Sequence, residues 1–286
     1  MKKPQWITLG IAVILTATIY LFGRTIPIKS SAGTTAQHTE NDGHSHEQHD
    51  LTIDSILVAA KRQLDPAQSA RINMLENSIS RGNVKGQQLD LYHQLSHFWG
   101  DTMQFFAPYA WYEGEAARLE NSEKTLTFAA RLFLDNLQRE QDPRLIRWQA
   151  LQAKDLFERS LKINPNNDSS KVGLGACYLF GNISASPMEG IQKIMEVTRK
   201  DSSNVYAQLV LARGSLLSGQ TEKAIARLLT VNRISPDNIE AILMLAEVFE
   251  RKGDKEKAAE WYRKSLQYIK RTDIRTEIEK RIAELQ

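Results

Sequence analysis

Apolar residues recur every three or four positions from residue 51 almost to the end of the chain. The spacing is clear near the start of this region, at Ile53, Ile56, Leu57 and Ala60. Such spacing places apolar side chains on one face of an α-helix. Asp65-Pro66 and Asp142-Pro143 have the composition of helix starts, because aspartate caps a first turn and proline fits the first helical position. No segment alternates apolar and polar residues as a half-buried strand does, so the pattern predicts an all-α fold.

The first 28 residues carry a different pattern. Residues 6–22 contain no charged side chain, and as a helix they would extend roughly 26 Å, slightly less than the ~30 Å of a bilayer core. Lys2 and Lys3 precede this run, but two basic residues follow it, so the charge distribution favours a cytoplasmic N-terminus only modestly. We expect residues 1–28 to form a single N-terminal transmembrane anchor. A cleaved signal peptide is the alternative.

Residues 29–50 contain no large apolar side chain. A segment of this composition cannot bury a core, so it is predicted to be a flexible linker. The linker holds four histidines among acidic residues, namely His38, His44, His46 and His49. Imidazoles and carboxylates can bind zinc, copper or nickel. A metal-handling role of this linker therefore stands as an alternative to a purely solvated tether.

Three segments repeat the same residue types with a period of about 34 residues. The segment that starts at Ile239 has Leu245, Ala246, Phe249, Gly253, Ala258, Tyr262 and Ser265 at positions 7, 8, 11, 15, 20, 24 and 27. The segment that starts at Val205 has Leu211, Ala212, Gly219, Ala224, Leu228 and Val231 at matching positions. The segment that starts at Asp168 has Leu174, Gly175 and Tyr178 at positions 7, 8 and 11. An earlier unit matches only in its second half, because residues 126–139 depart from the pattern.

This pattern resembles the tetratricopeptide repeat family, and the resemblance implies a right-handed solenoid of helical hairpins. The segments predicted after the linker are degenerate helical hairpins over 51–125, repeats over 126–272 with the best units at 168–204, 205–238 and 239–272, and a C-terminal capping helix over 273–286. In kind, the whole chain resembles bacterial membrane-anchored proteins of this family.

The stretch KVGLGACYLFG, residues 171–181, has three glycines and the single cysteine of the chain. It lacks the third glycine of a dinucleotide-binding loop, the Gly-Lys-Ser/Thr of a P-loop and the second cysteine of a redox pair. The resemblance places Gly175 where two helices of one repeat cross closely. Gly173 falls at no such position, so Gly173→Ala is expected to be neutral or stabilising. Cys177 is expected to have no redox role.

Few other side chains in the sequence could form a catalytic or metal-binding site. Asp90, His93, His97 and Asp101 share one predicted helix face, and two imidazoles one turn apart can bind zinc. That helix also needs a polar face, so we predict no metal site there. Residues 97–112 contain seven aromatic side chains. This density is typical of a packed core, with a binding platform as the alternative.

In the tetratricopeptide repeat family, positions 2, 5, 9 and 12 of each unit line a concave groove. The resemblance therefore implies groove residues Ser169, Val172, Ala176, Leu179, Tyr206, Leu209, Arg213, Leu216, Glu240, Leu243, Glu247 and Glu250. They grade from apolar to acidic along the chain. The lysine and asparagine with which some family members hold a C-terminal carboxylate are absent at positions 5 and 9. The predicted N-terminal helices either leave this groove open or cover its apolar part.

The net charge of +3 gives no argument for a nucleic-acid partner. The absence of catalytic motifs and of paired cysteines predicts a protein that is not an enzyme and uses no cofactor. We therefore expect a scaffold or adaptor that binds a partner protein, is tethered to a bacterial inner membrane and has its soluble domain in the periplasm. A chaperone-like accessory factor of a secretion or envelope-assembly machine is the alternative.

Overall fold

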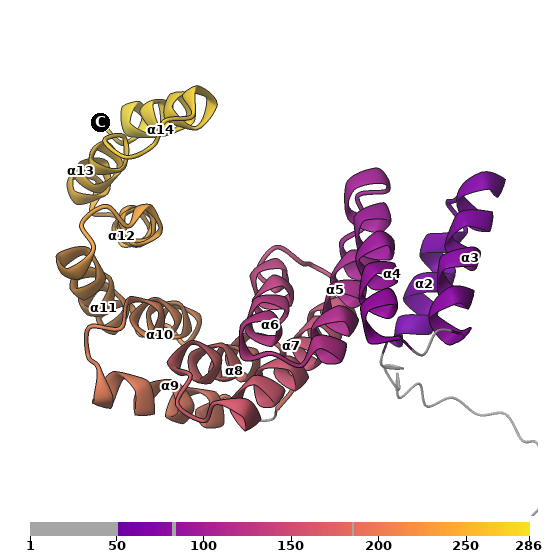
Figure 1. Cartoon of the computed structure of the whole chain (residues 1–286). Coiled ribbons are helices and arrows are strands. Elements are labelled where there is room, and N and C mark those ends of the chain that lie inside the picture. Colours follow the sequence, from indigo (N-terminus) through magenta and orange to yellow (C-terminus); the bar gives the residue numbers. More distant parts are fainter. Residues whose placement is uncertain (1–50, 82–83, 185) are drawn as a thin grey trace, which may run out of the picture. The chain divides into compact units, whose positions relative to one another are not determined.

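The computed structural model describes residues 51–81, 84–184 and 186–286, and this part of the chain consists of helices joined by turns and contains no strand (Figure 1). Its helices are α2 (Ile53–Lys61), α3 (Pro66–Arg81), α4 (Lys85–His97), the π-helix η1 (Phe98–Thr102), α5 (Phe106–Glu120), α6 (Glu123–Leu137), α7 (Pro143–Ile163), α8 (Asp168–Phe180), α9 (Met188–Lys200), α10 (Val205–Leu217), α11 (Thr221–Ile234), α12 (Ile239–Arg251), α13 (Lys255–Ser265) and α14 (Thr272–Leu285). The predicted all-α fold is confirmed for these residues.

The expected transmembrane anchor and the histidine-containing linker lie outside the described residues. Within the described residues, no helix combines the length and the apolar character that crossing a bilayer requires.

Asparagine begins the first helix of three successive hairpins. The side chains of Asn167, Asn204 and Asn238 accept hydrogen bonds from the backbone N–H three residues later, at 2.8, 2.9 and 2.8 Å. A cap of this kind satisfies one of the backbone donors left free in the first helical turn. The same polar residue at the same place in each unit therefore fixes where α8, α10 and α12 start.

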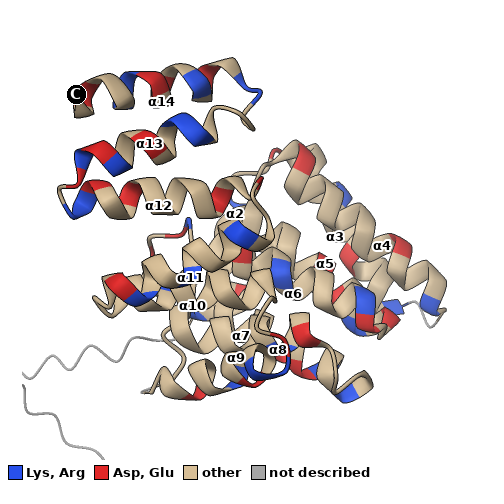
Figure 2. Cartoon of the chain, turned by 90° about the vertical axis from the view of Figure 1, so that its left-hand side faces the viewer, with Lys and Arg blue, Asp and Glu red and all other residues tan. Residues whose placement is uncertain are grey.

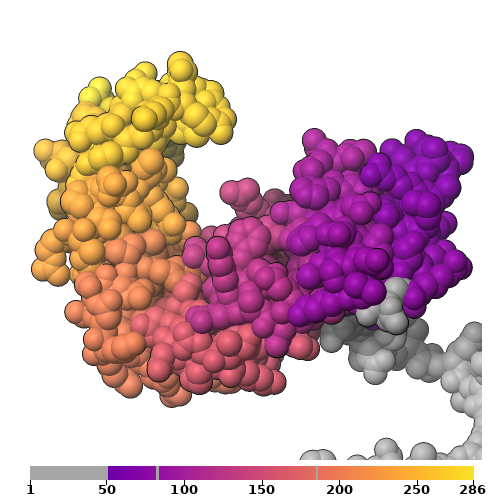
Figure 3. Space-filling view, viewed as in Figure 1, coloured from indigo at the N-terminus to yellow at the C-terminus, as the bar shows by residue number. Residues whose placement is uncertain are grey.

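Consecutive helices pair into hairpins that pack on one another. The pairs are α6 with α7, α8 with α9, α10 with α11 and α12 with α13. Each second helix from α7 onward also contacts the next first helix, or α14 at the end, and α8 contacts both α6 and α10. The molecular surface is accordingly continuous from α8 to α13 (Figure 3). Stacked hairpins of this type form a helical solenoid.

Two glycines bring α8 and α9 into close contact. A Cβ atom on Gly175 would lie 2.6 Å from the backbone oxygen of Gly190 and 2.5 Å from Cγ1 of Ile194. A Cβ on Gly190 would lie 2.3 Å from the oxygen of Gly175. Neither position can accept a side chain without separating the helices, so the packing role expected for Gly175 agrees with its surroundings.

The surroundings of Gly173 argue against the expectation that alanine is tolerated there. A Cβ atom there would lie 2.2 Å from Cζ of Phe157 and 2.6 Å from two further atoms of the ring. Phe157 is fully buried, so its ring is enclosed by other core atoms. Gly173 is thus the contact point of α8 with α7, the last helix of the preceding hairpin. The residue at position 6 of this unit is small because the Phe157 ring lies against it, and the general repeat pattern does not require a small residue there.

The apolar interior from α5 onward consists of two clusters that meet at α10. Ala207, Val210 and Leu211 belong to the cluster formed with α5 to α9. Leu209 and Ala212, on the opposite side of the same helix, belong to the cluster formed with α11 to α14. Helix α10 is therefore shared between an N-terminal core and a C-terminal core.

The aromatic segment 97–112 is largely core. Trp99 is fully buried, and Phe98 and Tyr112 are nearly so. They belong to a third apolar cluster, which is formed by residues of α2, α3, α4, η1 and α5. The turn between η1 and α5 places Gln104 in the left-handed region, at φ 55°. The aromatic density therefore serves packing at this end of the described chain.

Arg118 of α5 forms hydrogen bonds that link α5 to α7. The Arg118 guanidinium donates to Asp155, Gln152 and Glu115 at 2.7–2.8 Å and lies over the ring of Trp111. Arg159 also donates to Asp155. Burial alone would raise the pKa of the Asp155 carboxyl, but the hydrogen bonds from the two arginines outweigh it and hold the pKa below its usual range.

The last helix, α14, packs on α13 and carries charges of both signs (Figure 2). Its Arg281 pairs with Glu250 of α12 and with Glu284 of its own last turn. Only Ile278 and Leu285 of this helix are buried. One face of α14 thus covers the C-terminal core and the other is polar.

Candidate functional site

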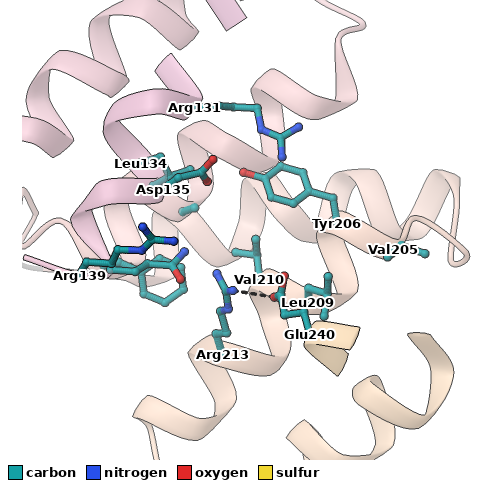
Figure 4. A pocket seen from close by; sticks show the side chains of 13 residues that line it. Arg131, Leu134, Asp135, Arg139, Val205, Tyr206, Leu209, Val210, Arg213 and Glu240 are labelled. Carbon is teal, nitrogen blue, oxygen red and sulfur yellow. Dashed lines mark ion pairs between the residues drawn. The ribbon is translucent and has the colours of Figure 1, made fainter. Parts of the chain in front are cut away.

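A cavity of about 690 Å³ lies where the first helices of successive hairpins meet (Figure 4). We call it the charged cavity. Its lining residues are Arg131, Leu134, Asp135, Gln138, Arg139, Ala176, Phe180, Val205, Tyr206, Leu209, Val210, Arg213 and Glu240. They come from α6 and the turn after it, from α8, from α10 and from the start of α12. No side chain of α2 to α5 lines it.

Helical spacing explains why these side chains converge. On α10, Tyr206, Leu209 and Arg213 are three and four residues apart and therefore share one face. On α6, Arg131 and Asp135 are one turn apart in the same way. The contacts of α8 with both α6 and α10 bring these two faces to the same cavity.

The charged groups of this cavity are unequally paired. Arg213 forms an ion pair with Glu240 at 2.6 Å, which links α10 to α12. The Arg131 guanidinium lies 5.0 Å from the ring centre of Tyr206, as in a cation–π contact. Among the described residues, Arg139 and Asp135 form no ion pair. Three arginines and two carboxylates leave the cavity with a net charge of +1.

The hydroxyl of Tyr206 points into this cavity, toward Asp135 (Figure 4). Its oxygen is buried and has no hydrogen-bond partner within the described residues. Burial raises the pKa of this hydroxyl well above its ordinary value, so the group stays protonated at neutral pH and can donate. A buried donor without an acceptor costs free energy, about 1–3 kcal/mol, which a bound acceptor would recover.

A second cavity of about 440 Å³ adjoins the first. We call it the leucine cavity. It is lined by Leu137, Gln138, Leu179, Phe180, Arg213, Leu216, Leu217 and Arg251. Gln138, Phe180 and Arg213 line both cavities, so the two are adjacent, and we call the pair the groove. Leu217 is 73% exposed.

The structure brings together seven of the twelve predicted groove residues. Ala176, Tyr206, Leu209, Arg213 and Glu240 line the charged cavity, and Leu179 and Leu216 line the leucine cavity. The other five, Ser169, Val172, Leu243, Glu247 and Glu250, line neither cavity.

Three of these five residues have a definite structural place. Val172 is fully buried in the N-terminal core, and Leu243 packs against the C-terminal core. Glu250 accepts a hydrogen bond from Tyr262 at 3.0 Å and pairs with Arg281, so it holds α12 to α13 and α14. Burial would raise the pKa of Glu250, but the bonds from Arg281 and Tyr262 lower it below its usual range.

Sequence reasoning missed the contribution of α6 and the turn after it. Arg131, Asp135 and Arg139 lie in the half-unit that had departed from the repeat pattern, so no groove position was assigned to them. Their spacing of four residues each is a detectable signal, because it places charged side chains on one helix face. The predicted groove changed from apolar to acidic along the chain. The observed groove instead has arginines and carboxylates in one cavity and mainly leucines in the adjacent one.

The other candidate groups do not form a site. His93 lies 3.5 Å from Glu113, and His97 lies 2.9 Å from Asp101. Within the described residues, no group of three or more potential metal ligands converges. Cys177 is fully buried, and burial raises the pKa of its thiol.

Tandem helical hairpins with a groove across their first helices define an α-helical repeat protein. The sequence model of the tetratricopeptide repeat matches residues 239–271, which cover α12 and α13. Residues 239–271 are thus a tetratricopeptide repeat, and the resemblance found from the repeat spacing is confirmed for this unit. A comparison with curated proteins gives no match.

Two solved structures are similar to parts of this chain. A MamA fragment of Desulfovibrio magneticus RS-1, residues 41 to the end, shares 21% identity, with 65% of this chain and 97% of that chain covered and a TM-score of 0.40. YrrB, described as a tetratricopeptide repeat protein with an unusual peptide-binding site, shares 13% identity, with 72% and 97% covered and a TM-score of 0.39.

Proposed function

We propose that the protein is a non-catalytic scaffold that binds a segment of a partner protein in the groove formed by the charged cavity and the leucine cavity. The observation that carries this proposal is that the two cavities lie side by side across first helices of successive hairpins and share three lining residues. Their volumes of about 690 and 440 Å³ fall in the range of pockets that hold several side chains or a small ligand.

The chemistry of the groove supports binding in preference to catalysis. Its charged side chains are mainly arginines, which stay protonated at all physiological pH values. Tyr206 has a raised pKa and is a poor proton acceptor or nucleophile. Such groups hold a ligand by hydrogen bonds and ion pairs. The leucines beside them add apolar area, as in the centres of protein interfaces.

Two exposed leucines give a matched test. Leu217 is 73% exposed and lines the leucine cavity, whereas Leu229 on α11 is 42% exposed and lines neither cavity. In affinity purification from native membranes, wild type and Leu229→Asp should both recover a partner in stoichiometric amount. Leu217→Asp should fail to recover that partner. The expected loss in affinity is about tenfold or more, from one unburied leucine and one buried charge.

The outcome also separates scaffold from chaperone. Recovery of the same partner by Leu217→Asp would refute binding in the groove. Recovery of many different proteins, none in stoichiometric amount, would favour the chaperone-like alternative.

We also propose that residues 1–28 tether this domain to a bacterial inner membrane with the domain in the periplasm. The support is the uncharged run 6–22 and the lysines before it. Protease added to spheroplasts should then digest the domain. Protection until the membrane is broken would place the domain in the cytoplasm.

A further inference from the structure

We infer that the groove selects a peptide segment in which an acidic side chain lies close to an apolar one. The carboxylate would enter the charged cavity, and the apolar side chain would enter the leucine cavity. This inference rests on the proposed function and adds the chemical class of the ligand.

The first argument is the balance of donors and acceptors in the charged cavity. Arg131, Arg139 and Gln138 offer guanidinium and amide N–H groups, and Tyr206 offers a buried hydroxyl with no partner in the described chain. Arg213 is already engaged by Glu240, and Asp135 is the one carboxylate of the cavity without an ion pair in the described chain. The available donors therefore exceed the available acceptors, which favours a ligand group rich in acceptor atoms.

The second argument is the amount of charge. The two carboxylates of the cavity, on Asp135 and Glu240, would repel a ligand that carries several negative charges at this place. The net charge of +1 matches a single carboxylate. A phosphate group carries about −1.5 to −2 at neutral pH and fits this balance less well. The observations thus favour an acidic amino acid over a phosphorylated or polyanionic ligand.

The third argument is what lies next to the charged groups. Leu179, Leu216 and Leu217 line the adjoining cavity, and Phe180 lies between the two. A free small carboxylate would leave this apolar surface exposed to water. A peptide can present a side chain to each cavity, because every second side chain of an extended chain lies on the same face, about 6.6 Å apart along its axis.

The test uses the full chain in detergent and an arrayed library of peptides that are acetylated at the N-terminus and amidated at the C-terminus. Wild type should enrich peptides with Asp or Glu close to Leu, Ile, Met or Phe. Tyr206→Phe and Arg131→Gln should each weaken binding of an enriched peptide by about tenfold, because each removes a hydrogen bond to a charged group. Arg199→Gln changes an exposed arginine of α9 outside the groove and should bind as wild type does.

A charge exchange makes the test specific for the contact. Arg131→Glu should lose the acidic preference and instead enrich Lys or Arg at the same peptide position, while it keeps the apolar preference. A merely structural effect of the substitution would lower binding of all peptides alike and would overturn the assigned contact.

The remaining outcomes separate this inference from the proposed function. Groove-dependent binding, lost in Leu217→Asp, without any acidic preference would overturn the inference and leave the scaffold function standing. Binding only to peptides with a free C-terminal carboxylate would overturn it in favour of chain-end recognition. A selected pool that is identical for wild type and Leu217→Asp, or no selected pool, would refute both.

Discussion

Replacing Gly173 by alanine tests how tightly successive hairpins pack. The new methyl carbon would lie 2.2 Å from Cζ of Phe157, whereas carbon atoms in contact are normally about 3.5–4.0 Å apart. The ring must therefore retreat by more than about 1 Å, or α8 must move away from α7. Because Phe157 is fully buried, neither movement is free.

Two opposing effects set the size of the change. Overpacking a core costs about 1–3 kcal/mol, and three ring atoms within 2.6 Å of the methyl place this site in the upper part of that range. Alanine is a better helix former than glycine by about 1 kcal/mol. The net expectation is a loss of about 1–2 kcal/mol in the free energy of unfolding.

Urea unfolding, followed by circular dichroism, measures this loss. Gly86→Ala is the matched control, because Gly86 is also helical and has no atom within 4 Å of an added Cβ. It should be neutral or stabilising. Phe157→Leu shortens the obstructing side chain, so Gly173→Ala should cost less in that background than in wild type. A Gly173→Ala protein as stable as wild type or more so would refute the packing argument.

Three further outcomes are expected. Gly175→Leu should destabilise the protein by at least as much as Gly173→Ala, since its Cβ would meet the backbone of Gly190; an unchanged unfolding midpoint would contradict this. Asp155→Asn should be less stable than wild type at pH 7; the difference should begin to shrink as pH falls through about 4 and should vanish only below the folded-state pKa, which hydrogen bonds from Arg118 and Arg159 hold lower. A difference that does not shrink in acid would rule out the ion-pair origin. A chain that starts at Leu51 should be soluble and strongly helical, and its aggregation under conditions where the full chain is well behaved in detergent would count against independent folding.

The parts of this fold that follow the repeat pattern were predictable from residue spacing. The starts of α8, α10 and α12 fall where the units were counted to begin, at Asp168, Val205 and Ile239. Local chemistry explains this success, because each start depends on an asparagine and on apolar residues within one helical turn.

Features that depend on a particular distant neighbour were not predictable. Gly173 is small because the ring of Phe157 occupies the space beside it, and a repeat pattern describes no such pair. Arg131 and Arg139 enter the groove because α6 packs on α8, although the residues around them no longer carry the repeat pattern. The groove surface therefore required the three-dimensional arrangement.

The sharing of α10 between two cores has a consequence for local unfolding. Helices α11 to α14 can open without exposing the N-terminal core, because solenoids gain stability mainly from neighbouring units. Such partial opening should appear as faster amide hydrogen exchange in α11 to α14 than in α6 to α8. The groove is lined from both sides of this boundary, by Arg131 on α6 and by Glu240 on α12. A ligand that contacts both would stabilise the closed form and slow exchange far from its own contacts, out to α14.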